Sequence, residues 1–403
     1  MLNIINANVV LADEVVEDSC VTIEDGVIMR IDGDTDNSGP VIDAQGAYLM
    51  PGMIDVHSDN IEQVIEPRAG SVMDIAFALR EQERQLVNNG ITTMYHSLSV
   101  WKTSGRQKAA REDGFQKKMV REIASMADSP RLITHMLHIR FDLLNIEAIP
   151  VIIEMLNEGY ISLLSFMDHT PGQGQYRDLE KHGAYMKILN PSLSEAEIYE
   201  RMEMRMRADK VPQEKLIDIA RLAKSAGVSI ASHDDDSVAK VDFVKNMLNA
   251  TISEFPVELD VARYAKNSGM ATLGGAANVM LGKSHSGNLS AVEGVLDGSI
   301  TMLCSDYYPP SMLPAVFKLH REYSMPLHDC VRLVTLAPAK AAGIDGSVGS
   351  VEEGKRADLI LIDASGEYPR LMTAITNGEI ASTMNYTKKL QKLQMLHSVA
   401  SGV

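Results

Sequence analysis

Eight apolar runs, separated by longer helical stretches, constrain the fold of this chain more than any other feature. The runs begin at Met53 and the last one ends at Asp306. In chain order they are MIDVH, ITTMYHSL, LITHMLHIRF, YISLLSFMDH, GVSIASH, ATISEF, MATLGG and ITMLCSD. Eight strands with intervening helices predict an α/β fold, a (β/α)8 TIM barrel of about 250 residues or somewhat more.

The two ends of the chain have a different, β-rich pattern. Residues 1 to about 50 contain short β segments, and Asp25-Gly26 lies between two of them as in a hairpin turn. After Gly343 the sequence returns to strands and turns. We therefore expect a small β domain formed by residues 1–50 and 346–403, and a barrel domain formed by residues 51–345.

Two of the stretches between apolar runs carry clear helix starts. Asp74 precedes the periodic segment IAFALREQERQLVNN, and SLSEAEIYERMEMRMR begins with a Ser/Glu capping pattern. These signals predict helices that begin at the capping residues.

The amino-acid composition limits the classes of molecule that this protein can bind. The chain has 403 residues, 45% apolar and 23% charged, which is typical of a folded protein. Its net charge of −16 argues against a nucleic-acid or anionic-membrane surface, which usually needs a basic face. No apolar stretch is long enough to span a membrane, and Cys20, Cys304 and Cys330 form no CxxC pair. We expect a cytoplasmic protein without nucleic-acid or membrane partners, in which a small anionic substrate would need local cations.

Polar residues at strand ends are the candidates for function, because the C-terminal face of such barrels carries the active site. Five of the runs end in imidazole or carboxylate groups, namely His57 with Asp59, Asp168 with His169, His233, Glu254, and Asp306. A single such residue more often satisfies a backbone group or caps the next helix. Five strands ending this way predict a site for a divalent cation such as zinc, manganese or iron. The acids Asp234, Asp235 and Asp236 are weaker candidates, since a helical pattern follows them directly.

Several segments together resemble the amidohydrolase superfamily over nearly the whole chain. They are AYLMPGMIDVHSD, the strand-end Asp306, VTLAPAKAAGI and GSVEEGKRADLILID. The resemblance implies a barrel flanked by a small β-sandwich built from both chain ends. It also implies one or two divalent metal ions, with zinc expected first, and Asp306 as both metal ligand and proton acceptor.

The ligand pattern departs from that of many members of the superfamily. The first strand carries HxD rather than HxH, Asp168-His169 stands where a carboxylated lysine is common, and Glu254 stands where a histidine is common. These departures leave the metal count open. Adjacent residues on a strand face opposite ways, so we expect His169 to be the ligand and keep Asp168 as a bridging alternative.

A finer resemblance narrows the reaction. The segments HSDNIEQVIEPRAG, SFMDHTPGQGQY, ASHDDDS, ISEFP, GGAANVMLGKSHSGN and LCSDYYPPSML are similar to those of the ribosyl triphosphate diphosphatases of the carbon–phosphorus lyase pathway. The resemblance implies hydrolysis of α-D-ribose 1-methylphosphonate 5-triphosphate to the 5-phosphate and pyrophosphate. The alternatives are another amidohydrolase acting on a C–N bond, such as a deaminase or cyclic amidase, and a noncatalytic ligand-binding barrel.

A ribosyl triphosphate carries several negative charges, which an acidic protein must neutralise with cations and hydrogen-bond donors. Candidate groups stand at the end of the third strand and in loops: His138, Arg140, Arg68, Arg177, Lys283, Ser284 and His285. The stretch from Thr170 to Gln175 begins a long loop that could close over the substrate. Oligomeric state is left open, with a homo-oligomer as one expectation.

Overall fold

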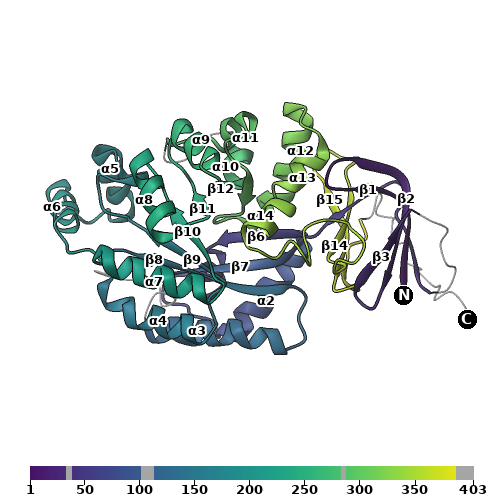
Figure 1. The fold of residues 1–403 in the computed structure, drawn as a ribbon, viewed down its shortest axis with the longest axis horizontal. Coiled ribbons are helices and arrows are strands. Elements are labelled where there is room, and N and C mark those ends of the chain that lie inside the picture. Colours follow the sequence, from purple (N-terminus) through teal and green to yellow (C-terminus); the bar gives the residue numbers. More distant parts are fainter. Residues whose placement is uncertain (33–38, 101–112, 283–286, 387–403) are drawn as a thin grey trace, which may run out of the picture.

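The computed structural model describes residues 1–32, 39–100, 113–282 and 287–386, which contain two separate sheets (Figure 1). One sheet is parallel and contains the eight predicted runs. Its strands are β6 (Met53–Ser58), β7 (Ile91–Val100), β8 (Thr134–Asp142), β9 (Leu163–Met167), β10 (Ser229–His233), β11 (Ile252–Glu254), β12 (Ala271–Gly275) and β13 (Met302–Cys304).

Backbone contacts after β13 join the last strand to the first. Ser58 pairs with Asp306, and the amide of Asp306 donates to the carbonyl of His57 at 3.0 Å. Inward side chains such as Ile54, Tyr95 and Leu163 fill the barrel interior. The predicted (β/α)8 barrel is confirmed, and its closure places the end of β13 beside the end of β6.

Helices surround the barrel and cover its outer face with buried apolar side chains. They are α1 (Asn60–Ile65), α2 (Ile75–Asn88), α3 (Asp113–Ser125), α4 (Ile149–Asn157), α5 (Leu179–Leu189), α6 (Glu195–Met206), α7 (Gln213–Ser225), α8 (Val238–Leu248), α9 (Leu259–Asn267), α10 (Ala276–Leu281), α11 (Ala291–Asp297), α12 (Met312–Tyr323), α13 (Leu327–Arg332) and α14 (Leu336–Ala341). Short 3₁₀ helices lie at η2 (Met126–Asp128), η3 (Ile146–Ala148), η4 (Gly174–Tyr176) and η5 (Pro309–Ser311). No helix in the described ranges has both the length and the apolar character to cross a membrane.

Both predicted helix starts are confirmed. The Asp74 carboxylate accepts from the amide of Phe77 at the start of α2. Ser194 and Glu197 form a reciprocal capping box at the start of α6. The Ser237 side chain caps α8 by accepting from the amide of Lys240, immediately after the run of three aspartates.

The second sheet is built from both ends of the chain. Its strands are β1 (Leu2–Val10), β2 (Val15–Glu24), β3 (Val27–Ile31), β4 (Val41–Asp43), β5 (Tyr48–Pro51), β14 (Leu359–Asp363), β15 (Arg370–Thr376) and β16 (Glu379–Thr383). Figure 1 places this sheet beside the barrel, at the side that carries α12 to α14.

The terminal sheet curls around its own apolar core. The turn between β2 and β3 is made by Asp25 and Gly26, both with positive φ, as the hairpin prediction requires. Gly26 packs against Gly378 in the β15–β16 turn, where an added Cβ would lie 2.7 Å from the Gly26 Cα. The two hairpin tips therefore meet, which gives the predicted sandwich-like unit from residues at both termini.

One insertion departs from the simple alternation of strands and helices. Between β9 and α7 the chain forms η4 and then two packed helices, α5 and α6, before it returns to the outer layer. Figure 1 shows this α5–α6 hairpin extending from the barrel at the side away from the terminal sheet. The hairpin contributes side chains to the cavity described below.

Candidate metal centre and active-site cavity

Three buried donors from three strands meet inside the C-terminal end of the barrel. His57 is the last residue but one of β6, His138 lies on β8 and Glu254 ends β11, and one donor atom from each lies within 4.8 Å of the others. Nδ1 of His57 is 2.9 Å from Oε1 of Glu254, and Nε2 of His138 is 3.8 Å from the same oxygen. Nδ1 of His138 lies 3.0 Å from both the Val56 carbonyl and the Ser97 hydroxyl, which fixes the orientation of its ring. We call His57, His138 and Glu254 the inner donor group.

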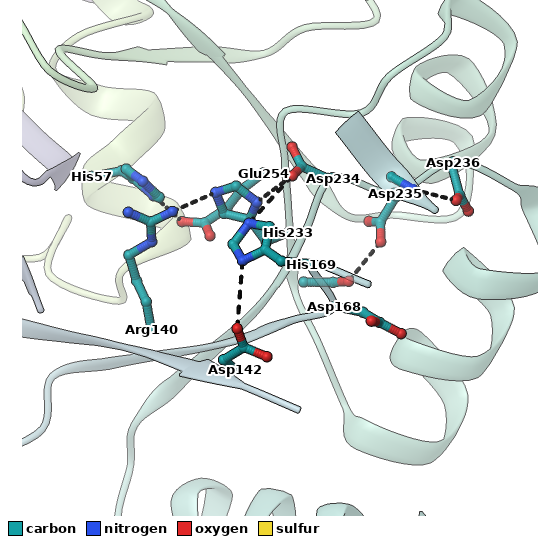
Figure 2. A network of polar contacts seen from close by, with 12 residues as sticks. His57, Arg140, Asp142, Asp168, His169, His233, Asp234, Asp235, Asp236 and Glu254 are labelled. Atoms are coloured by element: carbon teal, nitrogen blue, oxygen red, sulfur yellow. Dashed lines mark hydrogen bonds and ion pairs between the residues drawn. The ribbon is translucent and has the colours of Figure 1, made fainter. Parts of the chain in front are cut away.

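A second set of donors, His169, His233 and Asp234, lies next to it and forms the outer donor group (Figure 2). Oδ2 of Asp234 is 3.0 Å from Nδ1 of His233 and 3.7 Å from Nε2 of His169. The rings of His57 and His233 have centroids 5.4 Å apart, so the two groups adjoin.

Backbone geometry directs two acids toward this site. Asp234 follows β10 with φ of 53°, and Asp306 follows β13 with φ of 59°. This left-handed region is uncommon outside glycine, although aspartate adopts it more readily than most residues. Such conformations often occur at functional sites, where the surrounding structure maintains them.

Arg140 connects the outer donor group to the acids at the barrel mouth. Its Nη2 donates to Nε2 of His233 at 3.2 Å, and its Nη1 lies 3.8 Å from Oδ2 of Asp59. The side chain is nearly buried. Figure 2 shows its guanidinium between His57 and His233, so one permanent positive charge lies among the donors.

The donor chemistry fits a divalent cation. Among the described residues, no hydrogen-bond partner exists for the buried atoms Nε2 of His57, Nε2 of His138, Oε2 of Glu254 and Oδ1 of Asp59. Buried polar atoms in proteins are nearly always paired, so a cluster of unpaired imidazole and carboxylate atoms indicates a ligand that they bind. Nitrogen and oxygen donors of these types suit zinc, manganese or iron.

Burial keeps the histidines in the neutral form that a metal ligand needs. It lowers the pKa of His57 well below its usual value, and the nearby Arg140 and His233 add to this shift. It lowers the pKa of His138 to about 3 although Glu254 opposes the change, and it also lowers the pKa of His169. Neutral imidazoles bind a cation without first losing a proton.

The two acids of this site have opposite shifts. Burial raises the pKa of Asp306 to about 7, and repulsion from Asp59 adds to the shift. For Asp234, burial opposes ionisation, but attraction to His233 and the contact with it hold the pKa at about 2. Acids whose environments separate their pKa values in this way are candidates for different roles, here a proton acceptor and a permanent anion.

A cavity of about 500 Å³ opens above the donors. Asp59, Arg140, His169, His233, Asp234 and Asp306 contribute to its lining. The α5–α6 hairpin adds His182, Arg201 and Arg205 to the lining, and the chain from β12 to the start of β13 adds Leu273, Ala291 and Ile300. This size is typical of a small-molecule site.

The structure brings most of the predicted site residues together. His57, Asp59, His169, His233, Glu254 and Asp306 lie at the donors or the cavity, and Arg140 joins them. His138, expected to bind phosphate, instead lies within the inner donor group.

Other predicted residues lie elsewhere. The Asp168 carboxylate accepts from Lys210 at 2.7 Å and from the Thr170 amide at 3.1 Å, so it anchors the loop after β9 and not the donor cluster. Arg68 is exposed in the loop after α1, and Arg177 is exposed and paired with Glu258. Neither arginine lines the cavity. Lys283, Ser284 and His285 lie outside the described residues.

Some site residues carried a signal that the sequence interpretation did not use. Asp142 continues the inward-facing alternation of the predicted His138 and Arg140 along β8, and its Oδ2 lies 3.9 Å from Nδ1 of His169. The three aspartates after β10 separate in the structure: Asp234 joins the donors, Asp235 accepts from the hydroxyls of Ser232 and Ser253, and Asp236 accepts from the Gly174 amide. No such signal marks His182, Arg201 and Arg205, because they are helix residues in an insertion.

Comparison with known proteins agrees with this architecture. A family-wide sequence profile described as the Amidohydrolase family matches residues 183–390. The chain is 32% identical over 360 residues to alpha-D-ribose 1-methylphosphonate 5-triphosphate diphosphatase of Escherichia coli (strain K12), which covers 88% of this chain and 93% of the relative. It is 22% identical over 395 residues to imidazolonepropionase of Picrophilus torridus, which covers 89% of each protein. The chain belongs to the amidohydrolase family.

Solved structures share the fold at low sequence identity. N-acetylglucosamine-6-phosphate deacetylase from Pasteurella multocida superposes with a TM-score of 0.63 at 14% identity, covering 94% of this chain and 99% of its own. A putative prolidase from Bifidobacterium longum gives a TM-score of 0.64 at 13% identity, covering 96% of each chain. The chain is thus a hydrolase of amidohydrolase type with two adjoining groups of candidate metal ligands.

Proposed function

We propose that this protein is a metal-dependent diphosphatase that hydrolyses α-D-ribose 1-methylphosphonate 5-triphosphate to the ribosyl 5-phosphate and pyrophosphate. The observation that carries the proposal is a group of three arginines in the cavity above the donors of an acidic protein. Arg140, Arg201 and Arg205 line one cavity although the chain has a net charge of −16. Gathered arginines suit an anionic substrate better than a neutral amide. The 32% identical relative, whose name states this activity, supports the same substrate class.

The inner and outer donor groups would hold one or two divalent ions, for which zinc is the first expectation. Such an ion supplies a Lewis acid that activates water near neutral pH and offsets negative charge on a phosphoryl group. The six histidine and carboxylate side chains of the two groups, with Asp59 and Asp306 beside them, are the residues that would hold it.

The chain's own residues account for the remaining chemistry. Asp306 accepts a proton from the attacking water, because a group whose pKa is near neutrality suits a general base. The water oxygen forms a bond to the α-phosphorus as the bond from that phosphorus to the bridging oxygen breaks. Pyrophosphate leaves with the electron pair of that bond, and Arg140 stabilises the negative charge on the transferred phosphoryl group.

Product analysis in labelled water tests this proposal. Metal-loaded protein is incubated with the ribosyl triphosphate in H2¹⁸O and the products are followed by phosphorus NMR. The proposal predicts pyrophosphate without label and ribosyl 5-phosphate with one ¹⁸O. Label in the pyrophosphate would place the attack at the β-phosphorus. No triphosphate cleavage, together with turnover of a cyclic amide, would contradict the proposal in favour of C–N hydrolysis.

The location in the cytoplasm and the homo-oligomeric state expected from the sequence stay predictions. The free cysteines Cys20, Cys304 and Cys330 suit a reducing compartment.

A further inference from the structure

We propose that the α5–α6 hairpin is a phosphate clamp, in which Arg201 and Arg205 of α6 and His182 of α5 bind the two terminal phosphates of the substrate. The inference rests on the proposed function and assigns different parts of the substrate to different parts of the cavity. The hairpin would bind the part of the substrate that leaves as pyrophosphate, and the donors would act on the phosphorus that stays with the ribosyl group.

The arginines share one flank of α6. Arg201 and Arg205 are four residues apart, so they lie one above the other beside the stripe formed by Ile198 and Met202, which is buried. Both line the cavity. Arg207, the C-cap residue of α6, lies on the opposite flank, where it pairs with Glu203 at 3.1 Å and its side chain is 80% exposed. One helix thus has a pair of arginines at the cavity and a neutralised arginine facing solvent.

Like charges one turn apart on a helix destabilise it unless something offsets them. Glu203 pairs with Arg207, and the Asp142 carboxylate, 3.9 Å from Arg205, offsets part of the charge of one cavity arginine. A polyphosphate along this flank would offset both charges at once, because each guanidinium can donate two hydrogen bonds to phosphate oxygens.

Arg205 is linked to the outer donor group through the carboxylate of Asp142. Its Nη2 is 3.9 Å from Oδ2 of Asp142, and the same oxygen is 3.9 Å from Nδ1 of His169 in the outer donor group. The arginine is therefore separated from the outer donor group by a single carboxylate. A phosphate chain that starts at the donors would reach Arg205 first and Arg201, one turn earlier on the helix, next.

His182 supplies a neutral polar group at the same wall. Its side chain is largely buried against Tyr176, with ring centroids 4.1 Å apart, and among the described residues its Nδ1 has no hydrogen-bond partner. Burial lowers the pKa of this imidazole to about 4, and Arg205 adds to the shift. A neutral imidazole that lines the cavity can donate to a phosphate oxygen without repelling the two arginines.

The rest of the lining sets the direction of the substrate. The chain from β12 to the start of β13 contributes Leu273, Ala291 and Ile300, which offer apolar surface. Terminal phosphates placed against these side chains would lose their hydration without gaining a cation, which is strongly unfavourable. The hairpin, with its two arginines, is therefore the part of the lining that suits a highly charged pyrophosphate leaving group.

Calorimetric binding of inorganic pyrophosphate to the metal-loaded protein tests the clamp. We compare the wild type with Arg201→Gln and with the matched control Arg207→Gln from the opposite flank. The clamp predicts that Arg201→Gln weakens pyrophosphate binding at least tenfold, that Arg207→Gln changes it less than twofold, and that binding of inorganic phosphate changes much less in either variant. Equal weakening in both variants, or none in Arg201→Gln, would overturn the inference.

Kinetics with the ribosyl triphosphate separate this inference from the proposed function. Arg201→Gln should raise KM and the inhibition constant of pyrophosphate together, with the melting temperature unchanged or slightly raised, because the substitution removes a like-charge repulsion on α6. Cleavage of the triphosphate with unaltered pyrophosphate inhibition in Arg201→Gln would overturn the clamp and leave the function standing. Arginine-dependent pyrophosphate binding without cleavage would overturn the function and leave the clamp standing.

Discussion

At the scale of single residues, Asp306 combines a functional advantage with a cost in stability. Burial raises its pKa from 3.8 to about 7, so ionising this carboxylate in the metal-free fold is unfavourable. An acid whose pKa is raised by folding contributes most stability below its unfolded pKa, and that contribution is lost as the pH rises through the folded pKa. The metal-free protein should therefore lose stability from this group between about pH 4 and pH 7.

We predict that Asp306→Asn stabilises the metal-free protein at pH 8 by roughly 1–4 kcal/mol, because the buried charge is removed. The gain should shrink at pH 5, where the wild-type carboxyl is mostly protonated. Urea unfolding of chelated wild type and variant at both pH values measures the difference. If Asp306→Asn stabilised the protein less at pH 8 than at pH 5, the result would contradict a raised pKa for Asp306.

A second prediction distinguishes the role of Glu254 in metal binding from that of Asp168. Glu254 belongs to the inner donor group, whereas the Asp168 carboxylate is paired with Lys210 outside it. Glu254→Gln should lower metal affinity by at least tenfold, since replacing even the partners that orient metal ligands typically costs 10–100-fold. Asp168→Asn should retain the metal. Metal analysis after dialysis against a weak chelator measures both, and metal loss confined to Asp168→Asn would refute the placement.

At the scale of elements, the packing of α11 against the chain before β13 helps to place Asp306. An added Cβ at Gly294 in α11 would lie 2.4 Å from Cγ1 of Ile300, two residues before that strand. The helical Gly114 in α3 has open space at the same position. Gly294→Ala should therefore destabilise the fold by about 1–3 kcal/mol through overpacking. Gly114→Ala should be neutral or stabilising by about 0.5 kcal/mol, because alanine favours helix. Equal unfolding midpoints in urea would contradict this account of the α11 packing.

The sequence was most informative about the strands of the barrel. Parallel barrel strands are buried on both faces, so each appears as an apolar run, and all eight could be recognised. Strand-end residues such as His57 and Asp306 followed, because the barrel topology fixes where strands end. The cavity side of α6 could not be recognised, since Arg201, Arg205 and Arg207 are indistinguishable until the helix is docked.

At the scale of the whole molecule, the candidate metal centre ties distant parts of the chain together. Its donors come from β6, β8, β10 and β11 and from the chain after β9 and β10, and Asp306, after β13, lines the same cavity. We predict that chelation lowers the melting temperature by several degrees, and that adding back zinc or manganese restores it, because a ligand that binds only the folded state stabilises it. Thermal unfolding with and without chelator measures this, and identical curves for protein with and without bound metal would count against a shared centre.

The net charge of −16 illustrates what composition can and cannot predict. It indicated that any anionic substrate would need a local group of cations, and the cavity has three arginines in its lining. Composition did not indicate which cations these are: of the predicted Arg68, Arg140 and Arg177, the structure places Arg140 in the cavity. Loop arginines are free to pair locally, as Arg177 does with Glu258, whereas a strand-end arginine is directed inward by the barrel.

The most direct test of the central claim is pyrophosphate release from the ribosyl triphosphate as metal is titrated into the chelated protein. We expect release to rise in proportion to bound metal in the wild type and in Asp168→Asn. In Asp306→Asn, which lacks the proton acceptor, we expect metal to bind while the rate falls at least a hundredfold. Release that is independent of metal, or undiminished in Asp306→Asn, would contradict the account.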